Sequence, residues 1–229
     1  MKIDLHLHTN KDKMDRIKYS PYELIDFMAK RNYGVLAITH HNQIYFNENL
    51  KRYAEKKKIL LISGIEFRIN SHDILAYNIT EEDVKKVKKL RDVKKIKRKN
   101  TLIIAAHPYY PIYGLKEELE KNIDLFDAIE YCHWYTKYNN KGNERAVEVA
   151  KRYNLPLVAN SDCHRFMQVG TNYTILNCEK NVDAVIKAIK ENKIKIYTKP
   201  LLIRKYINIW FYIIISVLIK HLKKIVSNP

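Results

Sequence analysis

The sequence predicts an α/β fold built on a mostly parallel sheet, either closed as a barrel or open and doubly wound. Seven short apolar runs alternate with lysine-rich amphipathic stretches, which is typical of buried parallel strands connected by helices. The chain has 5 Gly and no GxGxxG motif, which argues against a dinucleotide-binding open sheet. Its 229 residues, 46% of them hydrophobic, are enough for one large domain or two small ones with a buried core.

The apolar runs set the expected strands in chain order. They are Ile3–Leu7, Val35–Ile38, Ile59–Ile62, Ile74–Tyr77, Leu102–Ala106, Ala128–Tyr131 and Leu157–Ala159. Between the first two runs, Ser20 is a suitable helix N-cap and Pro21 suits the first helical position. We therefore expect a helix from there to Arg31, with Gly34 shortly after its end.

A second helical pattern covers the lysine-rich segment Val84–Asn100 (VKKVKKLRDVKKIKRKN). Its apolar side chains form one stripe, which consists of Val84, Val87, Leu90, Val93 and Ile96. The segment is therefore expected to be one continuous outer helix of the fold.

The net charge indicates the kind of binding partner, and the cysteines indicate the cellular compartment. Lys plus Arg exceed Asp plus Glu by 42 to 25, a formal charge of +17 that favours anionic partners: nucleic acid, phosphorylated small molecules or an acidic membrane surface. A solvated basic face is the alternative. Cys132, Cys163 and Cys178 match neither a zinc finger nor a disulfide framework, and the first strand leaves no room for a signal peptide. We therefore expect a cytoplasmic protein.

The tail differs from the rest of the chain. The run Ile207–Ile219 (INIWFYIIISVLI) is almost wholly apolar and has basic residues on both sides. It is shorter than the roughly 20 residues that span a bilayer. Packing on the domain, a dimer contact and an anchor at the membrane surface are the alternatives. We expect one domain over residues 1–200 and a hydrophobic, basic-flanked C-terminal helix over residues 201–229.

Side chains that bind metals follow the apolar runs, each at the C-terminal end of its run. They are His6 and His8, His40 and His41, Glu66, His107, Glu130 and His133, and Asp162 and His164. In a parallel barrel these strand ends converge on one face. Histidine and carboxylate together favour zinc, manganese or iron, and this many groups exceed the three or four ligands of one zinc ion. The sequence therefore predicts a site for more than one metal.

The spacing within these motifs refines the prediction. His6 and His8 stand at i and i+2 of a strand, so both side chains point to the same side and can reach one centre. Asp162 and His164 have the same spacing, which places Cys163 between them on the opposite face. His40 and His41 are adjacent, so only one of them is expected to face the metals.

The ordered set of motifs resembles the PHP family, named for its polymerase and histidinol phosphatase members. The matching segments, in order over roughly residues 1–178, are DLHLHT at Asp4–Thr9, AITHHN at Ala37–Asn42, GIE at Gly64–Glu66, AAHP at Ala105–Pro108 and NSDCH at Asn160–His164. The resemblance implies a distorted (β/α)7 barrel with two or three divalent metal ions, Mn, Zn or Fe, at the C-terminal ends of the strands.

The resemblance also implies the ligands. Those that map directly are His6, His8, His41, Glu66, His107, Asp162 and His164. For an acidic ligand in the loop after the first motif, Asp15 is preferred to Asp12. For the ligand before the strand at residue 74, Asp73 is preferred to His72. His40 stands where the family has Asp, and His133 stands where many members have Asn.

Such a site suits hydrolysis of a phosphate ester, a phosphomonoester or a nucleotide, by a hydroxide shared between the metals. His107 and His133 are the candidates for protonating the leaving oxygen. The alternatives are a nuclease or nucleic-acid-binding module and a catalytically weak scaffold associated with a membrane.

Overall fold

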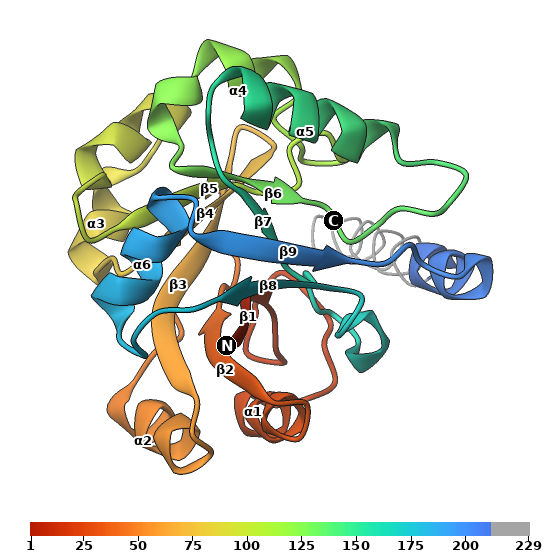
Figure 1. Ribbon diagram of the computed structural model, residues 1–229. Coiled ribbons are helices and arrows are strands. Elements are labelled where there is room, and N and C mark those ends of the chain that lie inside the picture. Colours follow the sequence, from red (N-terminus) through yellow and green to blue (C-terminus); the bar gives the residue numbers. More distant parts are fainter. Residues whose placement is uncertain (212–229) are drawn as a thin grey trace, which may run out of the picture.

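The computed structural model describes residues 1–211, and these residues form one strongly curved sheet of nine strands with helices around it (Figure 1). The strands are β1 (Lys2–Leu7), β2 (Tyr33–Ile38), β3 (Leu60–Ile69), β4 (His72–Tyr77), β5 (Leu102–Ala105), β6 (Ala128–Tyr131), β7 (Leu157–Ala159), β8 (Asn172–Leu176) and β9 (Ile194–Thr198). Their order in the sheet is β7-β6-β5-β4-β3-β2-β1-β8-β9. The predicted α/β class is confirmed.

Among the seven strands predicted from the sequence, β4 is the exception to the parallel order; the additional strands β8 and β9 pair antiparallel, β8 with β1 and β9 with β8. Strand β4 pairs antiparallel with both β3 and β5, whereas β1, β2 and β3 are parallel to one another, as are β5, β6 and β7. The expectation of a parallel strand at residues 74–77 is therefore wrong. The reason is the two-residue turn Asn70-Ser71, in which both residues have positive φ (50° and 64°), as in the tight turn of a hairpin. A regular (β/α)7 alternation is not confirmed.

The curvature of the sheet brings its distant strands together. Tyr77 on β4 is fully buried, and its hydroxyl donates to the Leu5 carbonyl on β1, at 2.8 Å. At the other side, the N–H of Ala159, the last residue of β7, donates to Thr174 Oγ1 on β8, at 2.9 Å, and the Leu5 N–H donates to Asn160 Oδ1, at 2.8 Å. The sheet is thus a nearly closed barrel, which gathers the strand ends into one area.

The helices cover the outside of the sheet (Figure 1). They are α1 (Pro21–Ala29), α2 (Glu48–Lys56), α3 (Glu81–Lys86), α4 (Glu117–Lys121), α5 (Lys141–Arg152) and α6 (Val182–Lys190), with 3-10 segments η1 (Leu90–Ile96), η2 (Ile123–Leu125) and η3 (Phe166–Gln168). The predicted N-cap is confirmed: Ser20 Oγ accepts from the Glu23 N–H, and the Glu23 carboxylate accepts from the Ser20 N–H.

The single helix expected over residues 84–100 is wrong. The structure has α3 up to Lys86, an extended Val87, and then the 3-10 helix η1. The Asp92 carboxylate accepts from the N–H groups of Lys88 and Lys89 and starts the new segment. Buried apolar residues recur every third position from 87 to 96, which matches the 3.0 residues per turn of a 3-10 helix better than the 3.6 of an α-helix.

Residues 203–211 are helical and lie against the barrel, where the buried Leu201 donates its N–H to the Tyr135 carbonyl, at 2.9 Å. The rest of the predicted apolar helix, from residue 212, lies outside the described residues, and the division at residue 200 stays a prediction. Within the described part of the chain, no helix has the length and apolar character needed to cross a membrane.

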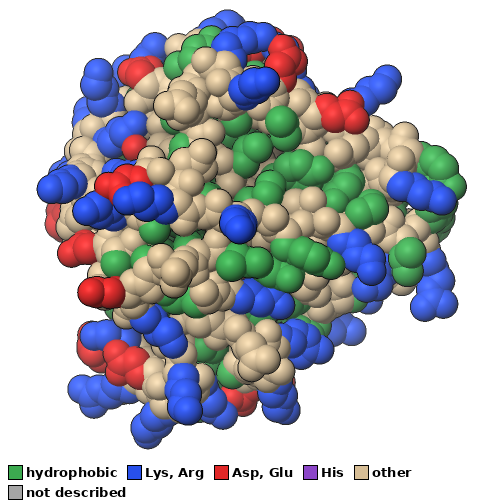
Figure 2. Space-filling view, in the orientation of Figure 1, with side chains coloured by type: hydrophobic (Ala, Val, Ile, Leu, Met, Phe, Trp, Pro, Cys, Tyr) green, Lys and Arg blue, Asp and Glu red, His purple; other side chains and the backbone are tan. Residues whose placement is uncertain are grey.

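The face of the molecule in Figure 2 carries its lysines and arginines scattered among other side chains. Hydrophobic side chains gather across the middle of this face, where β8 and β9 lie in Figure 1. This distribution resembles the solvated basic face that the composition left open.

Candidate metal centre

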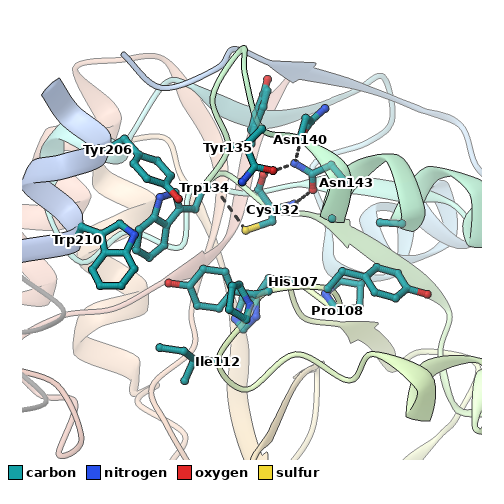
Figure 3. Close-up of a pocket in the computed structure, with 16 residues that line it drawn as sticks. His107, Pro108, Ile112, Cys132, Trp134, Tyr135, Asn140, Asn143, Tyr206 and Trp210 are labelled. Atoms are coloured by element: carbon teal, nitrogen blue, oxygen red, sulfur yellow. Dashed lines mark hydrogen bonds between the residues drawn. The ribbon is translucent and has the colours of Figure 1, made fainter. Parts of the chain in front are cut away.

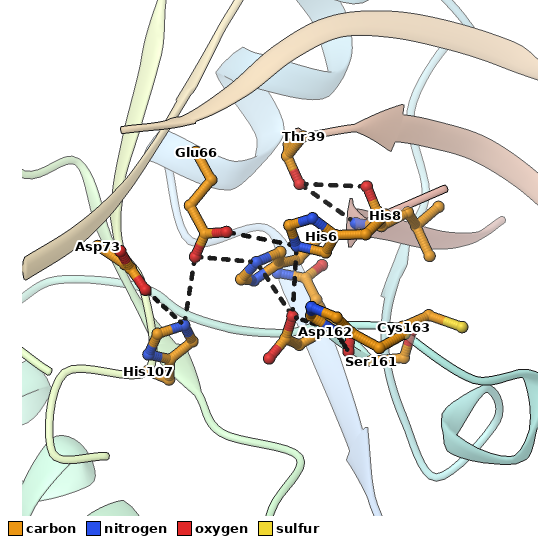
Figure 4. A network of polar contacts seen from close by, with 12 residues as sticks. His6, His8, Thr39, Glu66, Asp73, His107, Ser161, Asp162 and Cys163 are labelled. Atoms are coloured by element: carbon orange, nitrogen blue, oxygen red, sulfur yellow. Dashed lines mark hydrogen bonds and ion pairs between the residues drawn. The ribbon is translucent and has the colours of Figure 1, made fainter. Parts of the chain in front are cut away.

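The structure brings together all nine residues that the sequence predicts as metal ligands. Figure 4 labels six of them: His6, His8, Glu66, Asp73, His107 and Asp162. Each of the nine has an imidazole nitrogen or a carboxylate oxygen within 4 Å of another member of the set, which consists of His6, His8, Asp15, His41, Glu66, Asp73, His107, Asp162 and His164. Asp162, His164 and Asp15 are partly exposed, whereas the other six are buried. The convergence follows from the barrel, since the members come from strand ends far apart in the sequence.

Glu66 lies at the middle of the cluster. Strand β3 runs alongside the segment after β2, where the Glu66 N–H donates to the His40 carbonyl, at 3.1 Å. One carboxylate oxygen of Glu66 is 3.3 Å from His6 Nε2 and 3.4 Å from His107 Nε2. The other is 3.3 Å from His8 Nε2 and 3.0 Å from His41 Nε2. A single buried carboxylate thus faces four imidazoles.

The two histidines of the first motif turn the same nitrogen toward this centre. Nε2 of both His6 and His8 also lies 3.3–3.4 Å from Asp162 Oδ1, and neither Nε2 atom has a hydrogen-bond partner among the described residues. The opposite nitrogens are held by other carboxylates: His6 Nδ1 by Glu130 at 3.0 Å and His8 Nδ1 by Asp12 at 2.9 Å. This arrangement keeps the proton on Nδ1 and leaves the lone pair of Nε2 for a metal.

The two aspartates after the first motif both join the cluster. Asp12 Oδ2 lies 2.9 Å from His8 Nδ1 and 2.9 Å from His41 Nδ1, and its side chain is fully buried. Asp15 Oδ2 lies 3.0 Å from His164 Nε2 and 3.2 Å from His41 Nδ1. The sequence argument preferred Asp15, but a spacing argument could not foresee that the loop folds back so that both carboxylates face inward.

Asp73, rather than His72, faces the cluster. Its Oδ2 is 3.9 Å from His107 Nε2, whereas His72 Nδ1 bonds to the Gly114 carbonyl, at 3.0 Å. Alternation along β4 separates the two side chains, because successive residues of a strand point to opposite faces.

Arg68 is a member of the cluster that the sequence analysis missed. Its guanidinium donates to both carboxylate oxygens of Asp73, each at 2.7 Å, and its Nη2 is also 2.7 Å from His41 Nε2. It lies over the Tyr113 ring, 3.6 Å from the centroid. The signal was present in the sequence, since Arg68 stands two residues after Glu66 on β3 and therefore on the same face.

Glu130 supports the cluster by hydrogen bonds to residues near the ends of three strands. It is the last residue but one of β6, is buried, and accepts from three donors: His6 Nδ1 at 3.0 Å, the His107 N–H at 2.9 Å and Asn160 Nδ2 at 2.8 Å. Since Asn160 Oδ1 in turn accepts from Leu5, Glu130 links the ends of β1, β5 and β7. Its position near the end of an apolar run made it a candidate in the sequence, but only the fold shows that it supports other residues.

Two residues of the cluster have strained backbones. His107 has φ of 25° and Asp162 has φ of 45°, in the left-handed region that non-glycine residues rarely adopt. Such strain costs of order 1–3 kcal/mol per residue and collects at functional sites. Both residues lie in the segments that directly follow a strand, His107 after β5 and Asp162 after β7, so the strain accompanies the turning of each side chain into the cluster.

The charges of the cluster match a bound cation. Burial lowers the pKa of His8, but the hydrogen-bonded carboxylates of Asp12 and Asp162 outweigh it and raise the pKa to about 10. Burial raises the pKa of Glu66, yet the surrounding histidines, His41 and His6 foremost, hold it well below its usual value. The packed carboxylates thus favour positive charge among them, which protons or metal ions can supply.

His40 and His133 lie outside this network of short contacts. His40 Nε2 is 2.9 Å from Thr9 Oγ1, and burial lowers its pKa to about 3. Burial likewise lowers the pKa of His133 to about 4. His133 Nε2 accepts from the amide of Gln168, at 3.0 Å, so the proton of the neutral ring is on Nδ1. Of the adjacent pair His40 and His41, only His41 faces the cluster, as predicted.

The donor set fits divalent metals. Four groups of side chains each place one donor atom per residue within 4.8 Å of the others: His8, Asp12, Asp15 and His41; His6, Glu66 and His107; His6, His8 and Asp162; and His41, Glu66 and Asp73. Imidazole and carboxylate donors together suit zinc, manganese or iron. The unpartnered Nε2 atoms of His6 and His8 are the observation that favours a metal over a simple hydrogen-bond network.

Part of this chain matches a family model, and most of it is similar in sequence to one known protein. A family model described as PHP-associated matches residues 140–194. The uncharacterized protein MJ0417 of Methanocaldococcus jannaschii is 27% identical over 213 residues, which cover 88% of this chain and 82% of that protein.

Solved structures share the fold at low sequence identity. A two-domain protein of Bacteroides vulgatus, described as containing a PHP-like metal-dependent phosphoesterase, matches 86% of this chain with 18% identity and a TM-score of 0.65. This chain spans 64% of its length. A protein of Bifidobacterium adolescentis described as a metal-dependent phosphoesterase matches 71% of this chain and 87% of its own, with 16% identity and a TM-score of 0.55.

Proposed function

We propose that the chain is a metal-dependent hydrolase of the PHP family and that its substrates are phosphate monoesters. The observation that carries the proposal is the convergence of four histidine Nε2 atoms on the buried carboxylate of Glu66. The formal charge of +17 agrees with an anionic substrate.

We propose two groups of ligands. His6, His8, Glu66 and Asp162, with His107 beside them, would hold one metal. Asp12, Asp15, His41 and His164 would hold a second. Bound metal ions would polarise the phosphoryl oxygens and activate water for attack on phosphorus.

The protein's own residues position and neutralise charge. The Nδ1–H groups of His6 and His8 donate to Glu130 and Asp12, which orients both rings before substrate arrives. The Arg68 fork, held by Asp73, offers a fixed positive charge for a phosphoryl oxygen. Delivery of a proton to the leaving oxygen by His107 or His133 stays a prediction from the sequence.

The test is phosphate release by the purified protein, saturated with manganese or zinc. Glycerol 3-phosphate, adenosine 5′-phosphate, an aryl phosphate and a phosphodiester form the substrate panel. We expect release from at least one monoester that is lost after chelation and restored by metal. A metal-loaded protein that hydrolyses none of the four would contradict the proposal, and cleavage of the diester alone would support the nuclease alternative.

The position of Arg68 leads to a prediction about metal number. Its guanidinium lies between His41 and Asp73, two members of one donor group, so it and a metal on that group exclude each other. We expect the wild-type chain to bind two Mn²⁺ ions at saturation and the Arg68→Ala variant to bind three. Equilibrium dialysis followed by elemental analysis measures the ratio.

The matched control is Arg68→Lys, which keeps a positive charge beside Asp73 and is expected to bind two ions. Three ions on the wild-type chain, or no increase in Arg68→Ala, would show that Arg68 does not take the place of a cation.

A further inference from the structure

A cavity of about 390 Å³ opens beside His107 (Figure 3). It lies between the loops that follow β5 and β6, the start of α5 and the helical residues 203–211. Its volume falls within the range of 300–1,000 Å³ typical of small-molecule sites. Since the His107 Nε2 atom faces Glu66 in the metal cluster, one residue is shared by the cluster and the cavity.

Aromatic rings form a continuous wall from the cluster to the tail. Tyr110 contacts His107, with ring centroids 5.5 Å apart, and also Trp134, at 5.2 Å. Trp134 then contacts Tyr206 at 5.1 Å and Trp210 at 6.2 Å, both on the helical tail segment. In Figure 3, Trp134 lies beside these two tail residues.

The geometry of these contacts leaves ring faces available. Trp134 meets Tyr110 at an interplanar angle of 40°, Tyr206 at 64° and Trp210 at 77°. None of these three rings is stacked parallel on the indole of Trp134. The described ring contacts therefore leave the faces of the indole available for stacking. A planar ring gains both buried apolar area and favourable quadrupole contacts in such surroundings.

The polar side chains of the cavity are largely committed elsewhere. Asn143 exchanges two hydrogen bonds with the backbone of Cys132, at 2.8 and 3.0 Å, and also bonds to Asn140. Asn140 in turn donates to the Tyr131 hydroxyl, at 3.0 Å. The cavity therefore favours a flat apolar face more than a polyhydroxylated sugar, which needs many free polar partners.

We propose that this aromatic cavity binds the planar ring of the phosphate ester whose phosphoryl group lies at the metal cluster. The inference rests on the proposed function and narrows it to ring-bearing phosphomonoesters. Two sources of such a ring are a nucleoside, in which a sugar separates the ring from the phosphate, and an aryl group bonded directly to the phosphate oxygen.

The test compares substrate selectivity within each protein variant. We measure kcat/KM for adenosine 5′-phosphate, an aryl phosphate and glycerol 3-phosphate with wild-type protein, Trp134→Leu and the control Tyr138→Leu. Tyr138 is 71% exposed and does not line the cavity. The ratio of a ring ester to glycerol 3-phosphate serves as the readout, because a general loss of folded protein cancels from it.

We expect the wild-type ratio to exceed 1 and to fall about 10- to 100-fold in Trp134→Leu, the loss typical of one stacking contact. The control is expected to keep the wild-type ratio. The better of the two ring esters identifies the source of the ring. An unchanged ratio in Trp134→Leu, or a wild-type preference for glycerol 3-phosphate, would overturn the inference.

A binding measurement separates this inference from the proposed function. Titration of adenosine and of phenol into the wild-type protein, followed by nuclear magnetic resonance, requires no turnover. If no ester is hydrolysed but a ring compound binds and Trp134→Leu weakens that binding, the function fails and the ring site stands. If neither compound binds while glycerol 3-phosphate is hydrolysed, the ring site fails and the function stands.

Discussion

Replacing His8 by alanine is expected to reduce metal-dependent phosphate release by more than 100-fold. His8 Nε2 faces Glu66 and Asp162, and its Nδ1 is held by Asp12, so the variant removes one donor from the centre of the cluster. Loss of an outer partner of a metal ligand costs 10- to 100-fold in affinity or activity, and loss of a ligand itself should exceed this. Steady-state phosphate release and elemental analysis measure the two effects.

The matched control for this variant is His72→Ala. His72 lies on β4 next to Asp73 but bonds to the Gly114 carbonyl, away from the cluster. It should keep both metal content and activity within about 2-fold, since it contributes one hydrogen bond. Full activity in His8→Ala, with the protein folded by circular dichroism, would remove His8 from the proposed ligands.

The substitution Glu130→Gln should weaken metal binding by about 10- to 100-fold without changing any proposed ligand. Its carboxylate accepts from His6 Nδ1 and from the His107 N–H, so it orients one imidazole and the backbone of another. The amide keeps the shape but removes the negative charge that makes His6 a stronger donor to a metal. Competition with a metal-binding dye measures the affinity.

Two further variants complete this experiment. Glu55→Gln, on the exposed face of α2, is the control and is expected to bind metal as the wild type does. Glu130→Ala leaves buried donors without an acceptor, and each costs about 1–3 kcal/mol, so it should also lower the free energy of unfolding. Equal metal affinity in Glu130→Gln and wild type would show that Glu130 only supports the fold.

The positions of strands β1 to β7 and of most cluster residues could be predicted because their signals are local, whereas β8 and β9 were missed. In the run Ile3–Leu7, residues 3, 5 and 7 are apolar, and the polar residues His6 and His8 stand at its end. The pairing of His6 with His8 and of Asp162 with His164 could be predicted from the two-residue period of a strand. Their meeting with four other strand ends could be predicted because the C-terminal ends of parallel strands converge in a barrel.

Predictions that depended on the path of a loop or on a single turn were weaker. The direction of β4 depends on two residues with positive φ, Asn70 and Ser71, and no apolar pattern reports this. The 3-10 helix η1 has the same residues as an amphipathic α-helix and differs in a period of 3.0 instead of 3.6. The inclusion of Asp12 depends on how a loop without regular structure folds back.

The sequence by itself determined the donor set: imidazole and carboxylate side chains at the ends of buried strands, in an order that resembles that of the PHP family. Only the tertiary structure decided the arrangement, in which Glu130 supports His6 and Trp134 contacts the helical residues 203–211. The physical reason is that residue type and periodicity act over a few positions. Contacts between residues 60 or more apart exist only once the sheet has curled and its loops have packed.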